Sequence, residues 1–100
     1  MTSPSILVVD DETHILEVVE FILQDNGYVV TTASTASAAV NRFEELEPDL
    51  VVLDLNLPGV NGLDLLRRFR ELRPAVPIVM LTAKSEEIDR IIGLEVGADD

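Results

Sequence analysis

The sequence contains no cysteine and no tryptophan, and only four of its 100 residues are aromatic. Without cysteine, the chain has no disulfides, no thiolate metal sites and no cysteine nucleophile. Because aromatics are few, a core must be built mainly from Val, Leu, Ile and Ala. Hydrophobic residues make up 47% of the chain, which is enough for one small domain and argues against disorder.

Long apolar runs and basic residues are also scarce. No run approaches the roughly 20 residues of a membrane-spanning helix, and residues 1–5 lack the basic and apolar regions of a signal peptide. Seven Lys and Arg residues face 19 Asp and Glu residues, which gives a formal net charge of −12. Phosphate backbones repel such a surface, so a cation or a basic protein partner fits better than nucleic acid. With cysteine absent as well, we expect a cytoplasmic protein with no membrane contact.

Apolar residues follow two alternating periods along the chain. Short apolar runs predict buried strands, and stripes at helical spacing predict amphipathic helices. The first helix carries such a stripe, formed by Ile15, Val18, Val19 and Ile22. The predicted strands are 5–10, 28–32, 50–54 and 77–82, and the predicted helices are 12–26, 35–47, 61–72 and 85–96. This alternation is typical of an α/β domain, here 1–100, with a parallel sheet and helices on both faces.

Three of the predicted strands end in residues with groups that can take part in chemistry. Asp10 and Asp11 end the first strand, Asp54 ends the third, and Thr82 and Ala83 end the fourth. The carboxyl ends of parallel strands share one edge of a sheet, so the three carboxylates are expected in one small volume. Two unit charges about 4 Å apart repel by roughly 4 kcal/mol at an effective dielectric of about 20. Such a cluster either raises pKa values or recruits a cation.

The chemistry that these groups offer is phosphoryl transfer. Only oxygen ligands are available, which favours Mg²⁺ over Zn²⁺. A metal that neutralises the acids would leave Asp54 free to act as a nucleophile on a phosphoryl group. The hydroxyl of Thr82 and the backbone N–H groups after Asp54 and Thr82 are placed to bind the other phosphoryl oxygens. An aspartyl phosphate is the expected product.

Each of these groups also has an ordinary structural role. Taken alone, Asp10 and Asp11 would more often be a helix cap and a first-turn acid, Asp54 a turn former and Thr82 a capping hydroxyl. The pair Asn61-Gly62 is explained by turn chemistry. A chance arrangement of such groups at three strand ends is much less expected, so the combination favours a shared site.

Four segments of the chain resemble the receiver domain of two-component response regulators. They are ILVVDDE (6–12), DLVVLDLNLPGVNG (49–62), PIVMLTAK (77–84) and GLEVGADD (93–100). The resemblance covers essentially the whole chain. It implies a flavodoxin-like parallel sheet of strand order 2-1-3-4, with the family's fifth strand and fifth helix missing after residue 100.

The resemblance also implies a role for individual residues. Asp54 would accept a phosphoryl group from a sensor histidine kinase, and the domain would catalyse this transfer onto itself without being an enzyme in the usual sense. Asp11 would bind Mg²⁺ directly, Asp10 mainly through metal-bound water, and Asn56 through its backbone carbonyl. Thr82 would be the switch hydroxyl that moves towards the phosphoryl group.

Other matching positions concern the phosphoryl group and the partners. Ala83 would donate its backbone N–H to the phosphoryl group. The stretch 90–100 is similar to the winged-helix OmpR/PhoB branch, in which residues matching Arg90, Asp99 and Asp100 form salt bridges in a dimer. The resemblance thus implies a homodimer on activation and a role in transcription regulation, with DNA bound only through a domain absent from this sequence.

The sequence departs from the family pattern where it stops, at Asp100. Family members continue into a fifth strand, a lysine followed by proline, and a fifth helix. Without that lysine, one charge-assisted contact to the phosphoryl group would be lost, typically worth about 1.5–3 kcal/mol. An uncovered sheet edge favours association. We therefore expect a chain that truly ends at Asp100 to be unstable or to associate by adding or exchanging strands.

Other classes of function fit the sequence less well than the phosphorylation switch. A receiver that no longer phosphorylates, serving as an interaction or dimerisation fragment, stays open as the alternative. A phosphatase with an aspartyl intermediate usually carries its nucleophile in an Asp-x-Asp motif on the first strand, whereas this first strand ends in adjacent acids. Nucleotide binding is unsupported, because the sequence has neither a G-x-G-x-x-G motif nor a P-loop.

Overall fold

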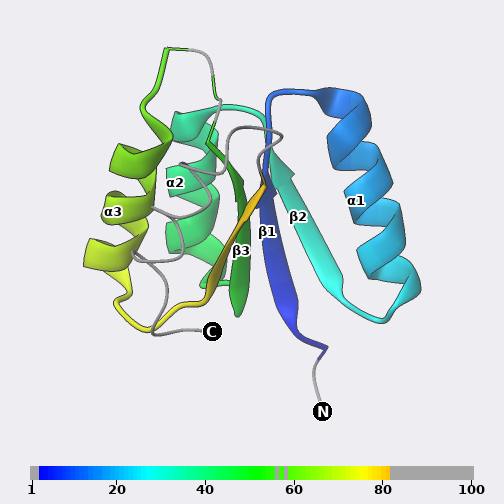
Figure 1. Ribbon diagram of the computed structural model, residues 1–100. Coiled ribbons are helices and arrows are strands. Elements are labelled where there is room, and N and C mark those ends of the chain that lie inside the picture. Colours follow the sequence, from blue (N-terminus) through cyan, green and yellow to red (C-terminus); the bar gives the residue numbers. More distant parts are fainter. Residues whose placement is uncertain (1–2, 56, 58, 82–100) are drawn as a thin grey trace.

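The computed structural model of the protein describes residues 3–55, 57 and 59–81, which form a parallel sheet with helices on both faces (Figure 1). The strands are β1 (Ser5–Val9), β2 (Val29–Ala33), β3 (Leu50–Asp54) and β4 (Ile78–Leu81), and the helices are α1 (Thr13–Asp25), α2 (Ala36–Leu46) and α3 (Gly62–Leu72). The strand order is β2-β1-β3-β4 and every pair is parallel. This confirms the predicted fold class. The predicted helix 85–96 lies outside the described residues.

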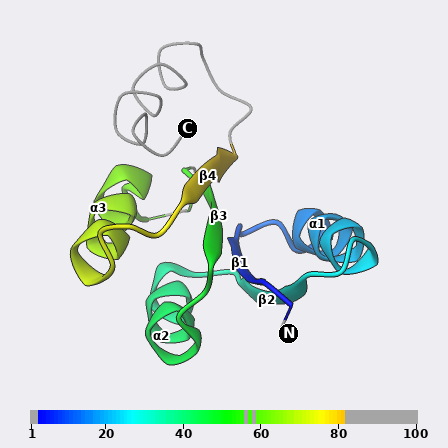
Figure 2. The ribbon, with the colours of Figure 1, turned by 90° about the horizontal axis from the view of Figure 1, so that it is seen from below.

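The sheet divides the core into two layers. Helix α1 covers one face of the sheet, and α2 and α3 cover the other (Figure 2). The larger apolar cluster lies on the α2 and α3 side and includes Phe43 and Phe69, while Leu16 of α1 packs on Ile6 and Val8 in the smaller one. Strands buried on both faces explain the near-continuous apolar runs of β1 and β3. Among the described helices, none combines the length and the apolar character that crossing a bilayer requires.

Helices α2 and α3 begin one residue later than the sequence predicted, because the preceding residue is a cap. Thr35 and Asn61 have extended backbones, and their side-chain oxygens accept hydrogen bonds from the N–H groups of Ala38 (3.2 Å) and Leu63 (2.9 Å). These bonds satisfy donors that the first helical turn leaves unpaired. At the other end of α2, Glu47 adopts a left-handed conformation with φ 47° and ends the helix.

The buried face of α1 differs from the predicted one. Leu16 is buried, and Val19 and Leu23 pack beside it against the sheet. Val18 and Ile22, which were predicted to face inward, are 54% and 52% exposed. Two overlapping apolar stripes run along this helix, and the one that contacts β1 and β2 is turned by a fraction of a helical turn from the one that the spacing favours.

Replacing Thr35 with alanine is expected to lower the free energy of unfolding by about 1 kcal/mol, because the Ala38 N–H loses its capping acceptor. Urea denaturation followed by circular dichroism measures the loss. The matched control is Ser34→Ala, which removes an exposed hydroxyl one residue earlier and should change stability by less than about 0.5 kcal/mol. Equal losses in the two variants would show that Thr35 is not the cap.

Candidate functional site

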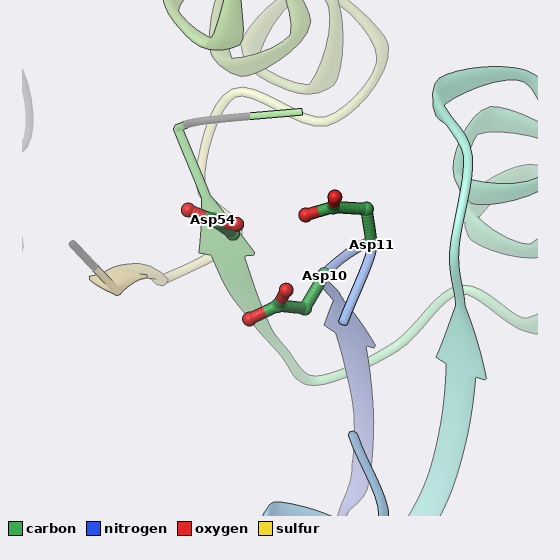
Figure 3. Close-up of side chains that lie close together, drawn as sticks. All are labelled: Asp10, Asp11 and Asp54. Atoms are coloured by element: carbon green, nitrogen blue, oxygen red, sulfur yellow. The ribbon is translucent and has the colours of Figure 1, made fainter. Parts of the chain in front are cut away.

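Three carboxylates lie together at the carboxyl-terminal edge of the sheet (Figure 3). Asp10 and Asp11 directly follow β1, Asp54 is the last residue of β3, and each offers an oxygen within 4.8 Å of the others. The strands β1 and β3 are parallel neighbours whose last pair is Val9 and Leu53. Asp10 follows Val9 and Asp54 follows Leu53, so the pairing of the two strands brings these acids side by side.

The environment of Asp10 disfavours its charged form. Asp10 and Asp54 are only 5% and 8% exposed, and they are the buried charged residues of the described chain; Asp11 is more accessible. Burial is the main cause that raises the pKa of the Asp10 carboxyl above its usual range. The N–H of Glu12, which donates to Asp10 Oδ1 at 2.9 Å, acts in the opposite direction, and the neighbouring charges of Asp54 and Asp11 raise the pKa further. A bound cation would relieve this penalty.

The donor set fits a hard divalent cation. It consists of carboxylate oxygens alone, which is the ligand type of Mg²⁺. Mg²⁺ holds its ligands at about 2.0–2.1 Å, so oxygens within 4.8 Å of one another would have to draw closer together to bind it directly, or would bind it in part through water. His14 lies outside the cluster: its imidazole is 73% exposed and 3.6 Å from the Glu12 carboxylate. The cluster could thus hold a metal ion, and its oxygen-only donor set suits Mg²⁺ better than Zn²⁺.

The remaining predicted site residues lie outside the described part of the chain. They are Asn56, Thr82 and Ala83 near the expected phosphoryl group, and Arg90, Asp99 and Asp100 in the expected dimer interface. Their roles stay predictions. The last described residue before Thr82 is Leu81, which is the parallel partner of Asp54 in the sheet.

Two features of the site were missed in the sequence. Gly62, which was explained as turn chemistry, packs against Leu55, the residue after Asp54. In addition, a groove of about 440 Å³ opens beside Asp11. It is lined by Asp11, Ser34, Thr35, Ala36, Ser37, Leu57 and Val60. No local pattern marks this groove, because its walls come from three separate connections between strands and helices.

The comparison with known sequences identifies the family that four segments of the sequence already resemble. Residues 6–100 match the family model of the response regulator receiver domain. The chain is 46% identical over 95 residues to the alkaline phosphatase synthesis transcriptional regulatory protein PhoP of Bacillus subtilis. It is 48% identical over 104 residues to the alkaline phosphatase synthesis transcriptional regulatory protein SphR of Synechococcus elongatus. Both matches cover 95% of this chain, which spans only 40% of the length of either relative.

Solved structures agree with this result. A CheY-like response regulator receiver domain protein from Methanospirillum hungatei has a TM-score of 0.88 at 34% identity, over 98% of this chain and 78% of that one. The chemotaxis protein CheY4 of Vibrio cholerae has a TM-score of 0.87 at 30% identity, over 96% of this chain and 82% of that one. Sequence and fold lead to one assignment: the chain belongs to the response regulator receiver domain family.

Proposed function

We propose that this chain is a phosphorylation-controlled switch module in which Asp54 accepts a phosphoryl group from a sensor histidine kinase. The observation that carries the proposal is the placement of the Asp54 carboxylate. It lies at the end of a central strand, 8% exposed, within 4.8 Å of two further carboxylates. Membership of the receiver family supports it. The domain would catalyse the transfer onto its own aspartate and would not turn over a separate substrate.

Asp10, Asp11 and Asp54 would hold Mg²⁺, and the backbone carbonyl of Asn56 is the further proposed ligand. When bound, the cation supplies positive charge that offsets the carboxylates and the incoming phosphoryl oxygens. The chain itself fixes the ligands. The N–H of Glu12 holds the Asp10 carboxylate, and β3 holds Asp54 in the sheet through its pairing with β4.

The chemical step needs an ionised Asp54. One of its carboxylate oxygens forms a bond to phosphorus while the bond from phosphorus to the kinase histidine nitrogen breaks, and the electron pair of that bond stays on the imidazole. Asp54 is only 8% exposed, which limits the contact of its side chain with bulk water. Thr82 and the Ala83 N–H are the proposed donors to the phosphoryl oxygens.

The output of the switch is the next part of the proposal. Both similar regulators described above are named transcriptional regulatory proteins. We infer that phosphorylation favours a homodimer through Arg90, Asp99 and Asp100, and that DNA is bound by a separate domain. The net charge of −12 makes this segment itself a poor ligand for DNA. A cytoplasmic location follows from the proposed kinase and DNA partners.

The test is the intact mass of the protein before and after incubation with Mg²⁺ and acetyl phosphate, a small phosphoryl donor. We expect the mass to increase by one phosphoryl group, and the increase to disappear when EDTA is present or when Asp54 is replaced by asparagine. Asp64→Asn is the matched control, because it removes an exposed carboxylate that pairs with Arg67 at 3.1 Å away from the cluster. An unchanged mass of the wild-type protein, or phosphorylation that persists in Asp54→Asn, would contradict the proposal.

A further inference from the structure

Gly62 lies where the first turn of α3 meets the chain that leaves Asp54. The residue is buried, and a Cβ atom added to it would lie 2.6 Å from Leu55 Cα and 2.7 Å from both the carbonyl oxygen and Cδ2 of Leu55. Real Cβ atoms essentially never approach another heavy atom so closely. Two of the three atoms belong to the backbone, so a change of rotamer at Leu55 does not relieve the contact.

Both sides of this contact are fixed by other interactions. The start of α3 is held by Asn61, whose side chain accepts from the Leu63 N–H at 2.9 Å. Further along the helix, Leu66 and Phe69 are buried in the core, so α3 moves away only at the cost of core packing. On the other side, Asp54 is held in the sheet by its pairing with β4. Leu55 therefore lies between Asp54, which the sheet holds, and the start of α3, which the core holds.

We propose that Gly62 is a positioning residue for phosphoryl transfer at Asp54. Because position 62 has no side chain, the start of α3 rests directly on the peptide that follows the phosphoacceptor. This contact holds the Asp54 carboxylate in reach of Asp10 and Asp11; Figure 3 shows the three carboxylates side by side. The inference rests on the proposed function, since it concerns the same site.

The variant that tests this is Gly62→Ala. The added methyl group must displace Leu55, so we expect the dissociation constant for Mg²⁺ to rise and the rate of phosphorylation by acetyl phosphate to fall. A displacement of about 1 Å at a reacting group costs roughly 100-fold in rate, so a loss of about 10- to 100-fold is expected. Isothermal titration calorimetry gives the affinity, and intact mass against time gives the rate. Both are measured where circular dichroism shows the variant to be folded.

Gly27→Ala is the matched control. Gly27 has a φ of +91° and no heavy atom within 4 Å of the added Cβ. The substitution strains the backbone and lowers stability, but it lies in the turn between α1 and β2, away from the acids. We expect its Mg²⁺ affinity and phosphorylation rate to stay within about twofold of wild type. A role of Gly62 in stability alone would make the two variants behave alike.

A double variant separates backbone contact from side-chain contact. Leu55→Ala removes only the Cδ2 contact, so adding it to Gly62→Ala should leave the Mg²⁺ affinity low. Recovery of wild-type affinity in the double variant would overturn the proposal.

A folded Gly62→Ala variant whose affinity and rate match wild type would also overturn the proposal. A Gly62→Ala variant that stays unfolded even in an osmolyte that favours the folded state would also overturn it, because the contact would then support the whole fold. If wild type binds Mg²⁺ but takes up no phosphoryl group, the proposed function fails while the affinity still tests Gly62.

Discussion

Replacing Asp10 with asparagine is expected to stabilise the metal-free protein at pH 7 and to weaken its response to Mg²⁺. Asp10 is 5% exposed, and its carboxylate lies beside two others. An asparagine side-chain oxygen still accepts from the Glu12 N–H, so the change removes the charge and keeps that hydrogen bond. We expect the free energy of unfolding in EDTA to rise by about 1 kcal/mol. Most substitutions of buried residues lower it instead.

The effect of Mg²⁺ should be larger. A cation at 100 times its dissociation constant stabilises the wild-type fold by about 2.7 kcal/mol. Loss of a group that acts through metal-bound water typically weakens metal binding 10- to 100-fold. At the same Mg²⁺ concentration, Asp10→Asn would keep only about 0.4–1.4 kcal/mol of that stabilisation. Urea denaturation with EDTA and with Mg²⁺ measures both effects on the same samples.

The pH dependence of these effects has a defined sign. Burial raises the pKa of Asp10 in the folded state above its value in the unfolded chain, which is about 3.9. Between these two pKa values the folded state holds more protons, so the stability of the metal-free protein falls as the pH rises through that interval. With Mg²⁺ the slope should reverse, because the cation binds the ionised carboxylates and is released as they are protonated. The difference in unfolding free energy between wild type and Asp10→Asn, measured across this pH range, isolates the contribution of Asp10.

Asp64→Asn is the control for the loss of one negative charge. Its carboxylate is exposed and pairs with Arg67, so removing it should lower stability by less than about 1 kcal/mol and leave the response to Mg²⁺ unchanged. If Asp10→Asn instead lowers stability in EDTA, the acid cluster is favourable without a cation. The argument that burial and charge repulsion favour a bound cation would then be wrong.

The cluster of Asp10, Asp11 and Asp54 could be predicted because the sequence pattern that marks it is local. Each strand that supplies an acid is an apolar run that stops at an aspartate, and parallel pairing alone brings the ends of such strands together. The pairing of Val9 with Leu53 confirms this topology. The strand order itself came from the resemblance to receiver domains, since an apolar run does not state which neighbour it pairs with.

The buried face of α1 and the role of Gly62 could not be read in the same way. Leu16 and Val18 are both large and apolar, and only the sheet beneath α1 decides that Leu16 is buried and Val18 exposed. Gly62 follows an asparagine, so the pair has the composition of a turn. Its contact with Leu55 depends on where α3 sits over β3, which is a property of the packed core.

The packing of α3 makes Phe69 the residue whose truncation should cost the most stability. Phe69→Ala is expected to lower the free energy of unfolding by about 3–5 kcal/mol, a large part of the total for a domain of this size. The side chain is fully buried, and its ring stacks on Phe43 of α2 with centroids 4.5 Å apart. The Arg73 guanidinium also lies over the Phe43 ring, 5.8 Å from its centroid, and Arg73 donates to the Pro48 carbonyl at 2.6 Å. A cavity at position 69 would therefore loosen both helices on this face of the sheet.

Leu72→Ala is the matched control, because Leu72 lies on the same helix and is 37% exposed. It should cost less than about 1.5 kcal/mol, since much of its side chain already contacts water. Urea denaturation of the two variants gives the comparison. A loss in Phe69→Ala as small as that in Leu72→Ala would mean that the stacked pair does not anchor α3. The helix could then retreat from Leu55, and Gly62→Ala should leave the Mg²⁺ affinity unchanged. The two experiments thus test one chain of contacts from the core to the phosphoacceptor.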